Sequence, residues 1–140
     1  MATFTSQIFE ILTLNGDNVG SSVTNVINNI NYVDNRILSV PSGSVTTLFS
    51  MDSIPGAGTF VTSSIQYIRV TNNSVTVPVQ LIISSSNEAM SYLIATGSSY
   101  MISTSKMTGS VGGLSFSDIK SVKVEPSGSS ASIEYYIITT

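Results

Sequence analysis

Hydrophobic and polar residues alternate most clearly in the stretch I-Q-Y-I-R-V-T-N-N-S-V-T-V-P-V-Q-L-I-I at 65–83. From residue 75 onward the odd positions are Val75, Val77, Val79, Leu81 and Ile83, and the even positions include Thr76, Pro78 and Gln80. A period of two is typical of a β-strand with one buried face. The Asn-Asn-Ser at 72–74 suits a turn with residues in left-handed conformation. This stretch therefore predicts a strand–turn–strand unit, with Val79 inside and Gln80 outside.

The same pattern recurs along the whole chain between Pro- and Gly-containing turns. Strands are expected at about 4–14, 22–33, 36–40, 45–50, 59–70, 75–84, 91–95, 99–104, 119–124 and 131–139. The turn segments between them include Asn15-Gly16-Asp17, Pro41-Ser42-Gly43, Pro55-Gly56-Ala57-Gly58, Gly109 to Gly113 and Pro126-Ser127-Gly128. The two glycine-rich segments, at 55–58 and 109–113, are not expected to continue any regular element.

Helical signals are weak. In the segment at 17–30 several Val and Ile residues fall at helix-like spacing, but β-branched residues, Asn and an internal Gly20 disfavour a helix there. The fold class predicted is all-β, an antiparallel β-sandwich of jelly-roll or Ig-like type with short loops and little or no helix. A length of 140 residues fits a single domain, 1–140, with 1–35 as a possible N-terminal arm or docking segment.

Pro78 adds a constraint on the strand order. Proline lacks the N–H that a central strand donates to its neighbour. The strand at 75–84 is therefore expected at a sheet edge or bulged at Pro78.

Charged residues are scarce, which narrows the partners. Only 13 of 140 residues are charged, whereas 27 Ser and 15 Thr supply most of the polar surface. Such a surface fits an extracellular-type β-protein, or one that is largely covered by other protein, since charges are depleted at interface cores. The five Lys and Arg residues are scattered, and none precedes Arg36. Neither nucleic acid nor an anionic membrane surface is therefore an expected partner.

The missing residue types also limit the chemistry. Without Cys there is no disulfide or thiolate metal site, and without His the commonest general base and metal ligand are gone. No apolar run is long enough to span a bilayer as a helix, and the first residues do not resemble a signal peptide. The expected location is the cytoplasm, unless the protein leaves the cell by lysis.

The motifs that could carry chemistry fail on spacing. Ser103/Lys106 and Ser117/Lys120 match S-x-x-K, but the companion motifs of serine acyl-enzymes are missing. A calcium loop from Asn15 would place Val19 and Val26 where oxygen ligands are required. The glycine clusters are not followed by Lys-Ser or Lys-Thr, so they do not indicate a phosphate loop.

Three further candidates have ordinary structural interpretations. Asp17, Asp34 and Asp52 could converge on a cation, but turn-forming Asp is the commoner role. Asn72 lies in a glycosylation sequon that is equally a turn sequence. The six tyrosines, which could line a sugar platform, are Tyr32, Tyr67, Tyr92, Tyr100, Tyr135 and Tyr136. We therefore predict no catalytic, cofactor-binding or metal-binding residue and no enzymatic activity, and the sequence does not identify an interface.

Several segments together resemble small β-sandwich virion proteins of tailed bacteriophages. They are V-P-S-G-S-V-T-T-L-F at 40–49, I-Q-Y-I-R-V-T-N-N-S and V-T-V-P-V-Q-L-I-I within 65–83, S-Y-L-I at 91–94, and I-E-Y-Y-I-I-T at the end. The likeness covers most of residues 36–140 and is one of pattern. It implies a non-enzymatic subunit without cofactor, a symmetric oligomer, often a trimer, docked on a protein shell.

The resemblance leaves several settings open. The first is a capsid decoration or cement protein bound to the major capsid protein and other virion proteins, assembled in the host cytoplasm and released by lysis. The second is a tail, adaptor or fibre-associated component. A carbohydrate-binding β-sandwich module is a third possibility, although Trp is absent. A genome-packaging jelly-roll subunit lacks support because the first 35 residues hold no Lys or Arg, and a pilin-type subunit because it would need a cysteine pair.

Overall fold

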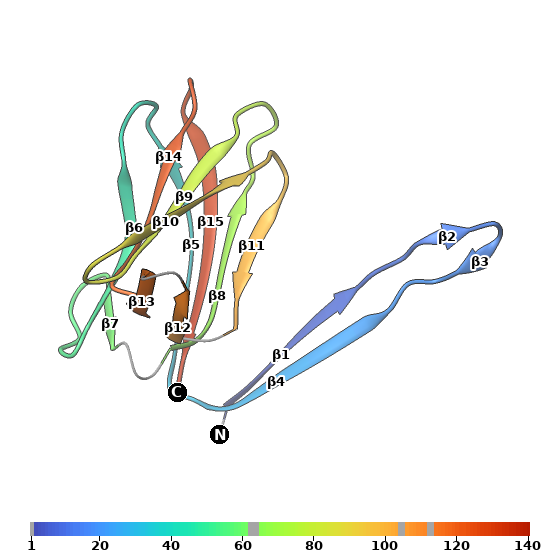
Figure 1. The fold of residues 1–140 in the computed structure, drawn as a ribbon, viewed down its shortest axis with the longest axis horizontal. Helices are drawn as coiled ribbons and strands as arrows, with labels where there is room; N and C mark the ends of the chain where they lie inside the picture. The colour runs from blue at the N-terminus through green and yellow to red at the C-terminus, as the bar shows by residue number, and fades with distance from the viewer. Residues whose placement is uncertain (1, 62–64, 104–105, 112–113) are drawn as a thin grey trace.

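The molecule consists of a β-sandwich and a long hairpin that projects from one end of it (Figure 1). The computed structural model describes residues 2–61, 65–103, 106–111 and 114–140, and its side chains are described outside 104–118. All regular elements within these ranges are strands. In the same part of the chain, no helix has the length and apolar character needed to cross a membrane.

The projecting hairpin, residues 2–30, is called the arm. Strand β1 (Ala2–Phe9) pairs antiparallel with β4 (Ser22–Ile30), and β2 (Thr13–Leu14) pairs with β3 (Asp17–Asn18) near the tip. At the tip, Asn15 and Gly16 have φ values of 51° and 90°. Both lie in the left-handed region that a two-residue type I′ turn requires, so the turn predicted at Asn15-Gly16-Asp17 is confirmed. Together the strands form one two-stranded ribbon.

Two facing sheets make the sandwich. The five-stranded sheet has the order β10 (Ala89–Ile94), β9 (Val79–Ser84), β14 (Ser121–Pro126), β6 (Thr46–Asp52), β7 (Thr59–Val61). The four-stranded sheet has the order β11 (Ser99–Ile102), β8 (Ile65–Asn72), β15 (Ala131–Thr139), β5 (Tyr32–Val40). All these neighbours are antiparallel except β6 and β7, which are parallel. Strands β12 (Lys106–Val111) and β13 (Leu114–Asp118) form a short hairpin. The all-β sandwich prediction is confirmed.

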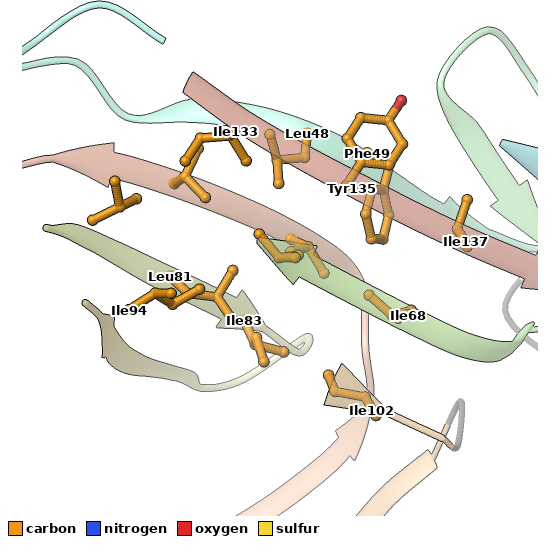
Figure 2. Close-up of a cluster of buried hydrophobic side chains, with 14 of the residues drawn as sticks. Leu48, Phe49, Ile68, Leu81, Ile83, Ile94, Ile102, Ile133, Tyr135 and Ile137 are labelled. Atoms are coloured by element: carbon orange, nitrogen blue, oxygen red, sulfur yellow. The ribbon is translucent and has the colours of Figure 1, made fainter. Parts of the chain in front are cut away.

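The hydrophobic core lies between the two sheets (Figure 2). Along β15, Ala131, Ile133, Tyr135 and Ile137 point inward and are buried, while the alternate residues point away from the core. Leu81 and Ile83 on β9 face them from the other sheet and are fully buried. Period-two alternation therefore specified which side of each strand is covered, as expected for a sheet with one face on the core.

The strand containing Val79 differs from the prediction at its beginning. It starts at Val79 rather than near residue 75, and Val75 is 90% exposed. β9 lies between β10 and β14, so the prediction of an edge strand or a bulge at Pro78 is wrong. Pro78 instead ends the preceding loop, where its carbonyl accepts a hydrogen bond from the Ser127 amide (3.1 Å). Because the proline cannot donate, the ladder begins at the next residue.

Other local expectations also needed correction. Gly109 lies inside β12, where it pairs with Phe116, although its cluster was expected to interrupt regular structure. Positive φ in non-glycine residues occurs at Asn15 and Asn29 among the described residues, and not at the predicted Asn-Asn pair at 72–73. The segment with helix-like spacing, 17–30, forms strands of the arm. In that segment pairing across the hairpin satisfies the backbone without a helix.

The buried and exposed faces of β9 can be tested by two substitutions at neighbouring positions. Val79→Asp should lower the free energy of unfolding by about 4 kcal/mol or more, because it places an unpaired charge in the core. Gln80→Asp should cost less than about 1 kcal/mol, since residue 80 is exposed and the only added strain is the like charge of Glu125 opposite. Urea denaturation of both variants measures the difference, and equal losses would contradict this facing.

Candidate functional site

Exposed apolar side chains are concentrated on the arm. Eight of the sixteen exposed large hydrophobic residues of the described chain belong to it: Ile8, Phe9, Ile11, Leu12, Leu14, Val19, Val23 and Val26. Monomeric proteins rarely expose a contiguous apolar surface of this kind unless it meets a partner. An isolated two-stranded hairpin is at best marginally stable in water. The arm is therefore the principal candidate for a functional surface.

One face of the arm carries most of these side chains. Ile8 lies opposite Val23 in the register, and Leu12 lies opposite Val19, whose amide donates to the Leu12 carbonyl (2.8 Å). In an antiparallel ribbon the residues of alternate pairs project on the same side. On this side, called the apolar arm face, lie the apolar residues Phe4, Ile8, Leu12, Leu14, Val19, Val23 and Ile27, with Ser6, Glu10, Asp17, Ser21 and Asn25 between them.

Gly20 is required where the two arm strands come close between their paired segments. A Cβ atom at this position would overlap the backbone carbonyl of Glu10. Next to this contact, the Glu10 amide donates to the Ser21 carbonyl (2.8 Å), and the Ser21 hydroxyl donates to the Glu10 carboxylate (2.7 Å). The glycine thus lets the register continue through to the tip.

The base of the apolar arm face packs on the sandwich. The ring centroid of Phe4 lies 5.0 Å from that of Tyr67 and 5.8 Å from that of Tyr136. Tyr67 and Ile138 pair across β8 and β15 and are buried, yet neither belongs to the core cluster between the sheets. They lie on the side of the four-stranded sheet that faces away from the core, which is called the outer face.

The remainder of the outer face is not covered by any described residue. It includes Val33 and Ile37 on β5 and Met101 on β11, which are 42%, 68% and 43% exposed. Between them, Arg69 and Glu134 form a salt bridge of 2.6 Å, and the Arg69 guanidinium lies 5.9 Å from the Tyr136 ring centroid. The outer face is thus apolar at its margins, and the salt bridge leaves its central charges paired.

The arm leaves the sandwich at a bend formed by asparagines. Asn29 has a φ of 59°, and the Asn31 amide donates to the Thr139 carbonyl (3.0 Å) at the end of β15. A cavity of about 390 Å³ lies in the angle between arm and sandwich, lined by residues 25–29, Gln66, Ser103 and Thr140. Beyond this angle the arm diverges from β8 and β11 and does not return to them (Figure 1).

A second candidate is a polar cluster at the open edge between the sheets. Asp34 is buried on β5 and accepts hydrogen bonds from Arg36 Nε (3.0 Å) and from the Tyr135 hydroxyl (2.9 Å). Burial first, and then the hydrogen bond to Asp34, raise the pKa of Tyr135 to about 12. The cluster borders a cavity of about 310 Å³ that also touches Tyr32 and Phe60. Both oxygens of the Asp34 carboxylate accept a hydrogen bond, so this carboxylate links β5 to β15.

The three aspartates considered as a cation site do not converge. Asp17 lies at the arm tip, far from the sandwich that holds the other two (Figure 1). Asp52 has the expected turn role, since its carboxylate accepts from the Ser53 amide (2.6 Å), but Asp34 is a buried strand residue instead. No group of three or more acidic side chains that could hold a metal occurs among the described residues. The ion pair between Asp34 and Arg36 could have been predicted from their D-x-R spacing, because residues two positions apart project on the same side of a strand.

The sequon residue Asn72 is fully buried and acts as a structural link. Its side-chain amide donates to the carbonyls of Val77 (2.8 Å) and Ile94 (3.2 Å), and its oxygen accepts from the Ser74 amide (3.0 Å). The turn interpretation of this sequence is therefore the one that fits. In this conformation the side chain is not accessible for glycosylation.

The remaining sequence candidates do not form a site. For the S-x-x-K matches, Lys106 and Ser117 fall in strands rather than at a helix start, and residues 104–105 lie outside the described part of the chain. The tyrosines separate into a Tyr67–Tyr136 pair and a stacked Tyr92–Tyr100 pair with centroids 4.8 Å apart. They do not build one exposed platform.

The Asp34 cluster gives a prediction for alkaline pH. Because the pKa values of Tyr135 and Tyr100 are raised from 10.0 to about 12, protonated tyrosine favours the folded state, and this stability is lost as pH rises from about 10 through 12. Tyr135→Phe should cost about 1.5–3 kcal/mol near pH 7 by removing a hydrogen bond to a buried carboxylate. The substitution should also reduce the loss of folding stability above about pH 10, without abolishing it, because Tyr100 still contributes. Denaturant titrations at pH 7 to 12 measure both, and an unchanged slope would contradict the assignment.

No protein-family model, curated protein or solved structure matches this chain.

Proposed function

We propose that this protein is a non-enzymatic structural subunit of a bacteriophage virion, a decoration protein that binds the capsid shell. A tail, adaptor or fibre-associated position is the alternative setting for the same role. The observation that carries the proposal is the arm, a ribbon whose apolar face lies outside any core of its own subunit. A projecting ribbon with an exposed apolar face is suited to binding another protein subunit.

The magnitude of the arm contact supports a repeated assembly. The five side chains beyond the arm base (Ile8, Leu12, Leu14, Val19 and Val23) expose on the order of 400 Å² of apolar surface, worth about 10 kcal/mol when buried. Association itself costs about 4–15 kcal/mol. A single arm contact is therefore marginal, whereas many copies on a symmetric lattice gain avidity without new contacts.

The uncharged surface supports the same role. Ser and Thr side chains can be buried against a partner at much lower desolvation cost than ions. The arm itself holds two acidic residues, Glu10 and Asp17, and no basic residue. The scattered tyrosines favour this role over a carbohydrate-binding module, which would need an exposed aromatic platform.

Binding of the purified chain to phage particles that lack it tests the proposal. We expect saturable binding that changes by less than about threefold between 0.1 and 0.5 M NaCl, because few charges are available to be screened. Co-sedimentation with quantitative mass spectrometry gives the number of copies per particle. Absence of the chain from native particles would refute the proposal, and release by moderate salt alone would refute the apolar basis of binding.

A further inference from the structure

The apolar arm face and the outer face pack against each other within one subunit, but only at the base of the arm. At the arm base, Phe4 covers Tyr67 and stacks on Tyr136, so the apolar arm face and the outer face already pack together there. The same arm face continues outward through Ile8 and Leu12, which no described residue of the sandwich covers. Beyond the contact with Phe4, the outer face likewise has no cover within the described part of the chain.

A subunit cannot complete this contact by itself in the observed conformation. The arm diverges from the four-stranded sheet after its base, and its tip at β2 and β3 lies far from β5 and β11 (Figure 1). Both surfaces are present in every copy of the chain. We infer that the arm of one copy lies on the outer face of a second copy, so that a closed oligomer forms by exchange of arms. This inference deepens the proposed assembly role and rests on it.

The area of the contact is sufficient for a stable oligomer. The free part of the apolar arm face, from Ile8 to Leu14, exposes on the order of 400 Å² of apolar surface. A subunit that both gives and receives an arm buries about twice this amount, because the arm of its neighbour covers a similar area of its outer face. That is close to the ~800 Å² of accessible surface per partner in a standard interface.

The chemistry of the two surfaces is compatible. The charged groups of the outer face, Arg69 and Glu134, form a salt bridge with each other, although the buried Arg69 Nε has no hydrogen-bond partner among the described residues. On the apolar arm face, the one carboxylate between Ile8 and Leu12, that of Glu10, accepts a hydrogen bond from the Ser21 hydroxyl. The arm of one copy contacts the outer face of another, so two different surfaces meet and the contact is heterologous. Only a closed arrangement then engages every arm without open-ended growth.

Two single substitutions, one on each surface, test the exchange in the full-length chain. Ile8→Asp damages the arm face, and Ile37→Asp damages the outer face. Each should raise the dissociation constant for self-association at least tenfold in sedimentation velocity. Thr24→Asp, on the opposite side of the arm next to Val23, and Leu93→Asp, an exposed leucine on the other sheet, should leave it within about twofold. Unchanged melting temperatures show that the variants are folded.

Mixing the two damaged variants separates exchange from other modes of association. The intact arm of Ile37→Asp should bind the intact outer face of Ile8→Asp, so an equimolar mixture should associate at least tenfold more tightly than either variant alone. Arm-to-arm pairing would weaken with Ile8→Asp alone, and that result would overturn the inference. A mixture that associates no more tightly than the separate variants would do the same. A monomeric wild-type chain that still binds particles would refute the exchange while leaving the proposed virion role intact.

Discussion

A two-stranded ribbon has no second layer against which to bury its apolar side, and the rest of the structure depends on this constraint. The sandwich solves this problem for its five-stranded and four-stranded sheets, since each covers the other and the alternating side chains meet in one core. The arm solves it only at its base, where Phe4 reaches Tyr67 and Tyr136. Along the rest of its length the arm exposes an apolar surface that water disfavours, and the proposed contact with another protein surface would cover it.

The sandwich gives the arm a fixed base. The bend at Asn29 and the hydrogen bond from Asn31 to Thr139 join the last arm strand to the end of β15, a strand with neighbours on both sides. At the opposite end of the same sheet, the buried Asn72 side chain ties together the loops around Val77 and Ile94. Polar groups at both ends of this sheet thus hold loops and strand ends in place.

Much of the fold follows from the sequence because a period of two has a direct physical meaning in a strand. β15 lies where the pattern placed it, at 131–139, and the Asn15-Gly16 turn has the backbone that its residues favour. Long-range relations were less accessible. Pro78 correctly indicated a break in pairing, but the sequence could not distinguish an edge strand from a strand that begins one residue later. Asp34 and Tyr135, which are 101 positions apart, become partners only through the register of β5 and β15. The apolar arm face was hidden because its residues look like those of any half-buried strand.

Hydrogen exchange of the arm amides, in the dilute monomer and in the assembled state, tests most directly whether a partner completes the arm. Local stability follows the burial that surrounds each backbone hydrogen bond. We expect the amides of residues 4–9 and 22–27 to exchange at least tenfold more slowly after assembly, while those of β14 and β15 change little. Arm amides as well protected in the monomer as those of β15, or unchanged on assembly, would contradict the claim that the arm is completed by a partner.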